Sequence, residues 1–167
     1  WQLLESLTDP EIPVVTLREL GILRDVRSVV AQDGSEQLEV VITPTYSGCP
    51  AMGQIEDDVY NLLLAHGLKG KVKTQLAPAW TTDWITPEAK EKLRAYGIAP
   101  PSRVCGSAAE QPQVMQFIRD AAVVDAVDCP HCGSAQTVEA SHFGSTPCKA
   151  LYKCLSCQEP FDYFKPF

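Results

Sequence analysis

The chain has 167 residues, of which 45% are apolar, a size that suits one ordinary domain of about 100 residues and a smaller second one. With 14 basic and 21 acidic residues the net charge is −7, so the chain lacks the basic surface that binding to nucleic acid or an anionic membrane requires. No apolar run approaches the length of a transmembrane helix. We therefore expect neither nucleic acid nor a membrane as a partner. Because residue 1 is Trp rather than Met, we expect the natural N-terminus to lie upstream.

Residues 1–98 predict an α+β domain of small helices and a sheet. Prolines 10 and 13 end the first helix, Asp33-Gly34 is a hairpin turn, and Gly97 ends the last helix. The order is therefore α-β-β-α-β-α. The predicted elements are an amphipathic helix with Trp1, Leu4 and Leu7 on one face, strands at 24–30 and 38–43, a helix at 50–66, a strand at 71–76, and a helix that Thr86 caps with Pro87 at its first position.

The turn between the second strand and the central helix presents Cys49. We expect Gly48 to take a positive φ, Cys49 to cap the helix and Pro50 to start it, so that the helix dipole lowers the thiol pKa. A thiolate there is a nucleophile or a metal ligand, whereas the alternative is a cysteine that only packs. Thr43 and Thr45 either donate hydroxyl hydrogen bonds to this site or simply end the strand.

Seven cysteines is an odd number, and four of them form two C-x-x-C pairs. This usage indicates metal in a reducing compartment rather than a disulfide framework, so we expect a cytoplasmic protein.

The two pairs are Cys129 with Cys132 and Cys154 with Cys157, separated by residues 133 to 153. Two such turns close a tetrahedron of thiolates around one ion, and strands at 137–141 and 150–153 make residues 129–167 a zinc ribbon. Four cysteines leave no open position, so one structural zinc per chain is expected. Rubredoxin-like iron in the same four cysteines is the alternative.

Several further groups are open to more than one interpretation. Cys148 is either a buried spare thiol or a ligand of a second site, and Cys105 lies in a predicted linker, residues 99–128, which has a possible short helix. Asp9 and Glu11 either cap a turn and form an ion pair, or converge with Cys49 on iron or an iron–sulfur cluster. One thiolate does not hold a cluster alone, so such a site calls for a second chain, through a homodimer or a client protein.

Several motifs together resemble a known family, and they span nearly the whole chain apart from the linker. The first domain resembles the iron–sulfur-assembly domain of SufT-like proteins, and the complete chain is similar to the PaaD (also called PaaJ) family of the phenylacetyl-CoA oxygenase system. One segment departs from the family's FGSTACKALY, and only at Pro147, which disturbs no ligand. The motifs are DPEIP at 9–13, TPTYSGCP at 43–50, PAWTTDWITPEAKEKLRAYGI at 78–98, and CPHCG, FGSTPCKALYKC and SCQEPFDYFK in the ribbon.

The resemblance implies an accessory role without catalytic residues. It implies help in assembling or delivering an iron–sulfur or iron centre to the oxygenase of aerobic phenylacetate degradation, with the iron–sulfur reductase subunit as the natural client. By similarity, the functional positions of the first domain are Asp9, Glu11, Thr43 and Cys49, and those of the second are the four ribbon cysteines.

Two other functions compete with this one. The first is a rubredoxin-like electron carrier within the oxygenase, with iron in the ribbon. The second is an enzyme with Cys49 as nucleophile, which requires a general base. His66 is the one histidine of that domain and lies at the far end of the same helix, roughly 24 Å away at 1.5 Å per residue, so it does not activate Cys49.

Overall fold

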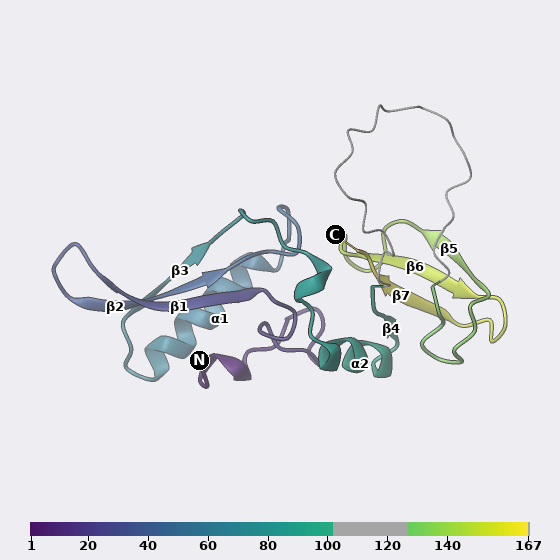
Figure 1. The fold of residues 1–167 in the computed structure, drawn as a ribbon, viewed down its shortest axis with the longest axis horizontal. Helices are drawn as coiled ribbons and strands as arrows, with labels where there is room; N and C mark the ends of the chain where they lie inside the picture. Colours follow the sequence, from purple (N-terminus) through teal and green to yellow (C-terminus); the bar gives the residue numbers. More distant parts are fainter. Residues whose placement is uncertain (102–126, 167) are drawn as a thin grey trace, which may run out of the picture.

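The computed structural model of this chain describes residues 1–101 and 127–166, and it confirms an α+β part followed by a small β module (Figure 1). The first part is built on a three-stranded sheet in the order β1-β2-β3, in which β1 is antiparallel to β2 and β2 is parallel to β3. Its strands are β1 (Leu23–Val30), β2 (Glu36–Ile42) and β3 (Gly70–Thr74), and the crossover from β2 to β3 contains α1 (Met52–Ala65).

The hairpin between β1 and β2 forms where the Asp-Gly step predicts it. Gly34 has φ +80°, a left-handed conformation that costs glycine nothing, and the Ala31 N–H donates to the Ser35 carbonyl over 2.8 Å. All three predicted strands are confirmed to within two residues at either end.

Helix α1 packs its apolar face on one side of this sheet (Figure 1). Ile55, Val59 and Leu63 recur every four residues and are buried, and they share a core with Val40 and Ile42 of β2. Each such aliphatic side chain, when fully buried, contributes about 1.5–3 kcal/mol. The sheet and α1 therefore hold the loop between them, which contains Cys49, on a fixed base.

The predicted N-terminal amphipathic helix is wrong. Residues Leu4–Ser6 form a single 3₁₀ turn, η1, and the chain then runs through the Asp9 segment without further helix. The i, i+3 spacing of Trp1, Leu4 and Leu7 is also the period of a 3₁₀ helix, and the prolines leave no room for more turns. Leu4 still packs into the core, so the apolar position was identified while the element was not.

The last helix of the first part confirms its prediction closely. After η2 (Thr82–Trp84), α2 spans Pro87–Ala95; the Thr86 hydroxyl accepts the Ala89 N–H, Pro87 stands at the first position, and Gly97 has φ +92° just beyond the end. The chain then enters β4 (Ile98–Ala99).

The C-terminal module is a sheet in the order β4-β7-β6-β5. Two of its strands were predicted, while β7 and β4 were not. Strand β4 pairs in parallel with β7, so the end of the first part belongs to the sheet of the ribbon. The ribbon strands are β5 (Thr137–Ser141), β6 (Lys149–Cys154) and β7 (Pro160–Phe164).

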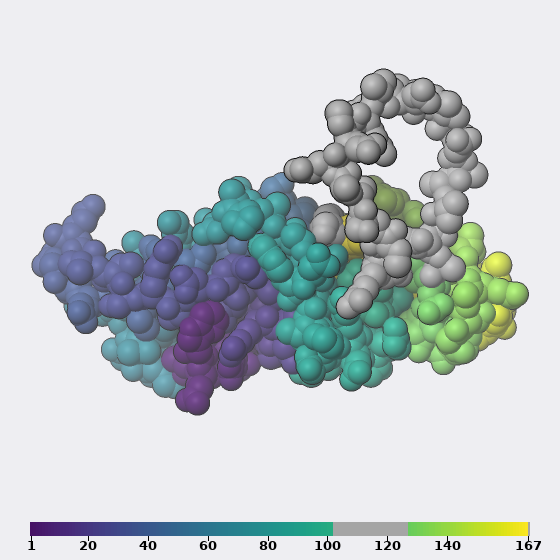
Figure 2. All heavy atoms as spheres, in the orientation of Figure 1, coloured from purple at the N-terminus to yellow at the C-terminus, as the bar shows by residue number. Residues whose placement is uncertain are grey.

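A shared core also joins the two parts. Phe164, at the end of β7, is 1% exposed and belongs to the core of the first part, where its ring centroid lies 6.0 Å from that of Trp80. Trp80 in turn donates its indole N–H to the Leu20 carbonyl over 2.9 Å. Figure 2 shows the teal segment that contains α2 lying between the first sheet and the ribbon.

Most of the predicted linker, including Cys105 and the possible short helix, lies outside the described residues. Within residues 1–101 and 127–166, no helix is both long and apolar enough to cross a membrane.

Candidate metal sites

The four ribbon cysteines form a closed ligand set. Their sulfur atoms all lie within 4.8 Å of one another, with 3.8 Å between Cys129 and Cys157 and 3.6 Å between Cys132 and Cys154. A tetrahedron with metal–sulfur bonds of about 2.3 Å has sulfur–sulfur edges of about 3.8 Å. The sulfurs thus stand where the ligands of one tetrahedral ion stand, and the donor set fits zinc.

The four thiols do not hold their protons equally. Although backbone N–H groups act in the opposite direction, burial and the neighbouring sulfurs raise the pKa of Cys132 and raise that of Cys157 to about 12. The Cys157 N–H approaches the Cys154 sulfur to 3.5 Å, and this donor together with the Ser156 N–H lowers the pKa of Cys154 to about 6. A thiol with a lowered pKa loses its proton to a metal more readily. His131 packs edge-on against Phe161 instead, with ring centroids 6.5 Å apart, so it belongs to the packing of the ribbon rather than to the ligand set.

The Cys49 turn differs from its prediction in two ways. Helix α1 begins at Met52 with Ala51 as its cap residue, so Cys49 lies before the helix and does not cap it, and Gly48 is not among the glycines with positive φ in the described residues. The thiol is half-buried, and its pKa is raised rather than lowered: burial outweighs the one favourable contact, a hydrogen bond from the Ala51 N–H, and the charge of Glu11 adds to the increase. Cys49 is therefore a protonated thiol until a metal displaces the proton.

Asp9 and Glu11 form the second segment of this region. One Asp9 carboxylate oxygen accepts the N–H groups of Glu11 and Ile12, both over 2.9 Å, as the turn-cap interpretation predicts. Asp9 is buried, and burial raises its pKa despite these two bonds. Burial and the charge of Asp9 also raise the pKa of Glu11.

The chain brings these carboxylates to the Cys49 turn. The negative charges of Glu11 and Asp9 both raise the pKa of the Cys49 thiol, and so does the charge of a third group, Cys148 of the ribbon. Among the described residues, however, only the ribbon cysteines place three or more ligand atoms within 4.8 Å of one another. No three of the ligand atoms around Cys49 are therefore grouped as closely as the ribbon sulfurs are.

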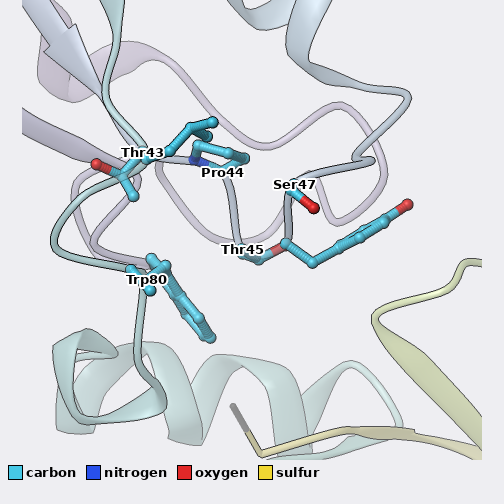
Figure 3. Close-up of a pocket in the computed structure, with 8 residues that line it drawn as sticks. Thr43, Pro44, Thr45, Ser47 and Trp80 are labelled. Carbon is cyan, nitrogen blue, oxygen red and sulfur yellow. The ribbon is translucent and has the colours of Figure 1, made fainter.

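Thr43 lies at another part of the same loop. It lines a groove of about 380 Å³ with Thr45, Ser47 and Trp80, where its side-chain oxygen points away from Thr45 and Ser47 (Figure 3). This hydroxyl is buried and is the one buried side-chain oxygen or nitrogen without a hydrogen-bond partner in the part of the chain that is described. The Thr43 hydroxyl therefore makes no hydrogen bond to the Cys49 sulfur.

Two residues of this region were not predicted from the sequence. Tyr46 is near enough to Cys49, Cys148 and Glu11 that their charges, after burial, raise its pKa. Lys149 is 5% exposed, and its charge lowers the pKa of Asp9, of Glu11 and of Cys148. Tyr46 directly follows Thr45 in TPTYSGCP, and Lys149 directly follows Cys148 in FGSTPCK. Their position next to predicted site residues was the signal in the sequence that could have identified them.

Comparison with known sequences finds two family models that match separate parts of the chain. Residues 1–75 match the family described as "Iron-sulfur cluster assembly protein", and residues 116–165 match the one described as "PaaD zinc beta ribbon domain". The chain is 45% identical over 166 residues to an Escherichia coli (strain K12) protein named as the D component of a "Putative 1,2-phenylacetyl-CoA epoxidase", with 99% of this chain and 90% of that protein covered.

Two solved structures resemble part of the chain. A DUF59 domain from Bacillus anthracis is 28% identical, with a TM-score of 0.46, and the match covers 55% of this chain and 85% of that one. Rv1466 from Mycobacterium tuberculosis, described as associated with iron–sulfur complex assembly and repair, is 26% identical, with a TM-score of 0.37, and the match covers 57% of this chain and 81% of that one. From the match to the E. coli protein over nearly its whole length, the chain belongs to the PaaD family, the D components of the phenylacetyl-CoA epoxidase system.

Proposed function

We propose that this protein is a non-catalytic accessory subunit that assembles an iron–sulfur or iron centre and delivers it to a component of the phenylacetyl-CoA oxygenase. The observation that supports the proposal most is the meeting of Asp9, Glu11 and Cys49 from two separate segments. Burial, together with the two carboxylates, raises the thiol pKa, so a metal bound there competes with a proton, which favours release to a client with more acidic thiols. Because thiol ligands require a reducing compartment, the proposal locates the protein in the cytoplasm.

In this proposal the ribbon holds one structural zinc through Cys129, Cys132, Cys154 and Cys157. Its closed shell leaves no position for substrate, so its role is to stabilise the module and to offer a docking surface for the client. The iron–sulfur reductase subunit is the proposed client, since its centre is ligated by thiolates. A homodimer is an alternative source of further ligands for Cys49.

A rubredoxin-like electron carrier is the second candidate, because the same sulfur tetrahedron also accommodates iron. The two functions differ in where iron resides: near Cys49 in the delivery function, and in the ribbon in electron transfer.

A transfer assay tests the delivery function. Protein loaded with iron and sulfide is mixed with the cluster-free reductase subunit, and the appearance of the cluster on the reductase is followed by its absorption after separation. We expect transfer from the wild type and loss of transfer from Cys49→Ser, with ribbon zinc content unchanged. Undiminished transfer from Cys49→Ser would contradict the proposal.

A further inference from the structure

A second thiol, Cys148 of the ribbon, approaches the Cys49 region of the same chain. Cys49 packs against the core that contains Phe164, and Cys148 adjoins the strand end that brings Phe164 there. Cys148 is buried, its sulfur is 3.0 Å from the Thr146 hydroxyl, and its carbonyl accepts the Lys165 N–H over 3.0 Å. Thr146 is also near enough to the Glu11 carboxylate to lower its pKa. Thr146 therefore lies between Glu11 of the first part and Cys148 of the ribbon.

The strand register explains why Cys148 reaches the first part. Lys149 opens β6 and pairs with Phe164 of β7, whose side chain lies in the core of the first part. This end of β6 faces the first sheet in Figure 1. Cys154 closes the same strand, so the zinc ligands and Cys148 lie at opposite ends of β6 and Cys148 is separate from the closed tetrahedron.

A buried cation accompanies the thiol. The Lys149 ammonium lies 3.5 Å from an Asp162 carboxylate oxygen, and the lysine side chain is only 6% exposed. Its charge also acts on Asp9, Glu11 and Cys148. A buried lysine is costly unless negative groups surround it, and here it offsets part of the charge that two thiolates and two carboxylates accumulate when a metal binds.

We propose that Cys148 is the second thiolate of the iron centre held by Cys49, so that the ligand shell is assembled across the two parts of a single chain. This inference rests on the proposed function and specifies its site. Because no three of these ligand atoms are grouped as closely as the ribbon sulfurs are, a polynuclear iron–sulfur cluster fits them better than mononuclear iron. Each thiol releases one proton as its sulfur binds iron, and the step needs no oxidant or reductant. A second chain is then not required to supply the second thiolate.

Anaerobic reconstitution with ferrous iron and sulfide tests this assignment. The absorption and Mössbauer spectra of the wild type are compared with those of Cys49→Ala and Cys148→Ala, with Ser28→Ala, an exposed residue of β1, as the control. Zinc content and the unfolding temperature verify that each variant is folded, and Cys148→Ser replaces Cys148→Ala if the smaller side chain loses zinc.

We expect a cluster in the wild type and in Ser28→Ala, and a loss of at least tenfold in iron affinity in both cysteine variants, since even indirect partners of metal ligands are worth about 10–100-fold. A cluster of wild-type affinity in the Cys148 variant, together with its loss in Cys49→Ala, would overturn the role of Cys148 and leave the delivery function standing. Absence of a cluster from zinc-loaded wild type would overturn both.

Discussion

The thiols at the two ends of β6 differ in how closely they are grouped and in the charges around them. At the ribbon end, four sulfurs already stand at tetrahedral spacing, and backbone N–H groups lower the pKa of Cys154 to about 6 while the pKa values of Cys132 and Cys157 are raised. At the other end, burial and carboxylates raise the pKa of Cys49 and burial raises that of Cys148, and no three ligand atoms are grouped as closely. A preorganised shell retains its metal, whereas one that must be deprotonated and drawn together releases it more readily. In the proposed function, one strand thus connects a site that retains its metal to one that exchanges it.

The largest expected effect comes from breaking the retention site. Cys132→Ser should unfold the ribbon, because zinc binding in such modules supplies about 10–16 kcal/mol of folding free energy. Metal analysis and circular dichroism check this, with Cys49→Ser as the matched control that keeps its zinc. Native zinc content in Cys132→Ser would contradict the assignment.

The next effect tests the coupling between the two parts. Phe164→Ala should destabilise the protein by about 3–5 kcal/mol, because the ring fills the core of the first part from the end of β7. Hydrogen exchange measured along the chain should show loss of protection in both α1 and the ribbon.

Phe161→Ala is the matched control for this coupling, since Phe161 packs only within the ribbon core. Its loss of protection should stay within β5, β6 and β7. If Phe164→Ala changed the ribbon alone, the shared core would not couple the two parts.

A smaller effect concerns the charge beside Cys49. Burial holds the pKa of Asp9 in the folded protein above its ordinary value of 3.8. Ionisation of Asp9 therefore lowers the free energy of unfolding, and this loss of stability develops as pH rises from 3.8 through the pKa of Asp9 in the folded protein. Asp9→Asn keeps an oxygen that accepts two N–H groups and removes the charge. We expect it to raise the free energy of unfolding of iron-free protein at pH 7, with the gain shrinking as pH falls toward 3.8.

Glu39→Gln is the control of opposite sign. Hydrogen bonds and charges from Lys71 and Arg27 lower the pKa of Glu39, so its contribution to stability is present above 4.5 and is lost as pH falls. This variant should be destabilised at pH 7 and approach wild type in acid. Urea unfolding of each variant and wild type measures the difference, in which the common zinc contribution cancels. A gain for Asp9→Asn that did not depend on pH would contradict the burial of an ionised carboxylate.

The features predicted correctly from the sequence are those that depend on residues close together in the chain. The cap of α2 at Thr86, the hairpin at Gly34 and the four ribbon cysteines rest on residues a few positions apart, and the structure confirms all three. The cap role of Cys49 also looked local, but α1 starts later, at Met52, and burial then reversed the direction of the pKa shift.

The remaining features depend on contacts between distant segments. The pairing of β4 with β7 and the entry of Phe164 into the first core have no signature in either segment alone. The approach of Cys148 to Glu11 follows from these contacts, so it could not be predicted from the sequence either. The division into residues 1–98, 99–128 and 129–167, and the functional roles of Asp9, Glu11, Thr43 and Cys105, stay predictions.

The most direct test of two different metal sites in one chain is metal analysis with an absorption spectrum on anaerobically purified protein, comparing wild type with Cys49→Ser. We expect one zinc per chain in both proteins and, in the wild type alone, an iron–sulfur absorption that the variant lacks. One iron per chain with a rubredoxin-like spectrum that Cys49→Ser leaves unchanged would place iron in the ribbon and contradict the account.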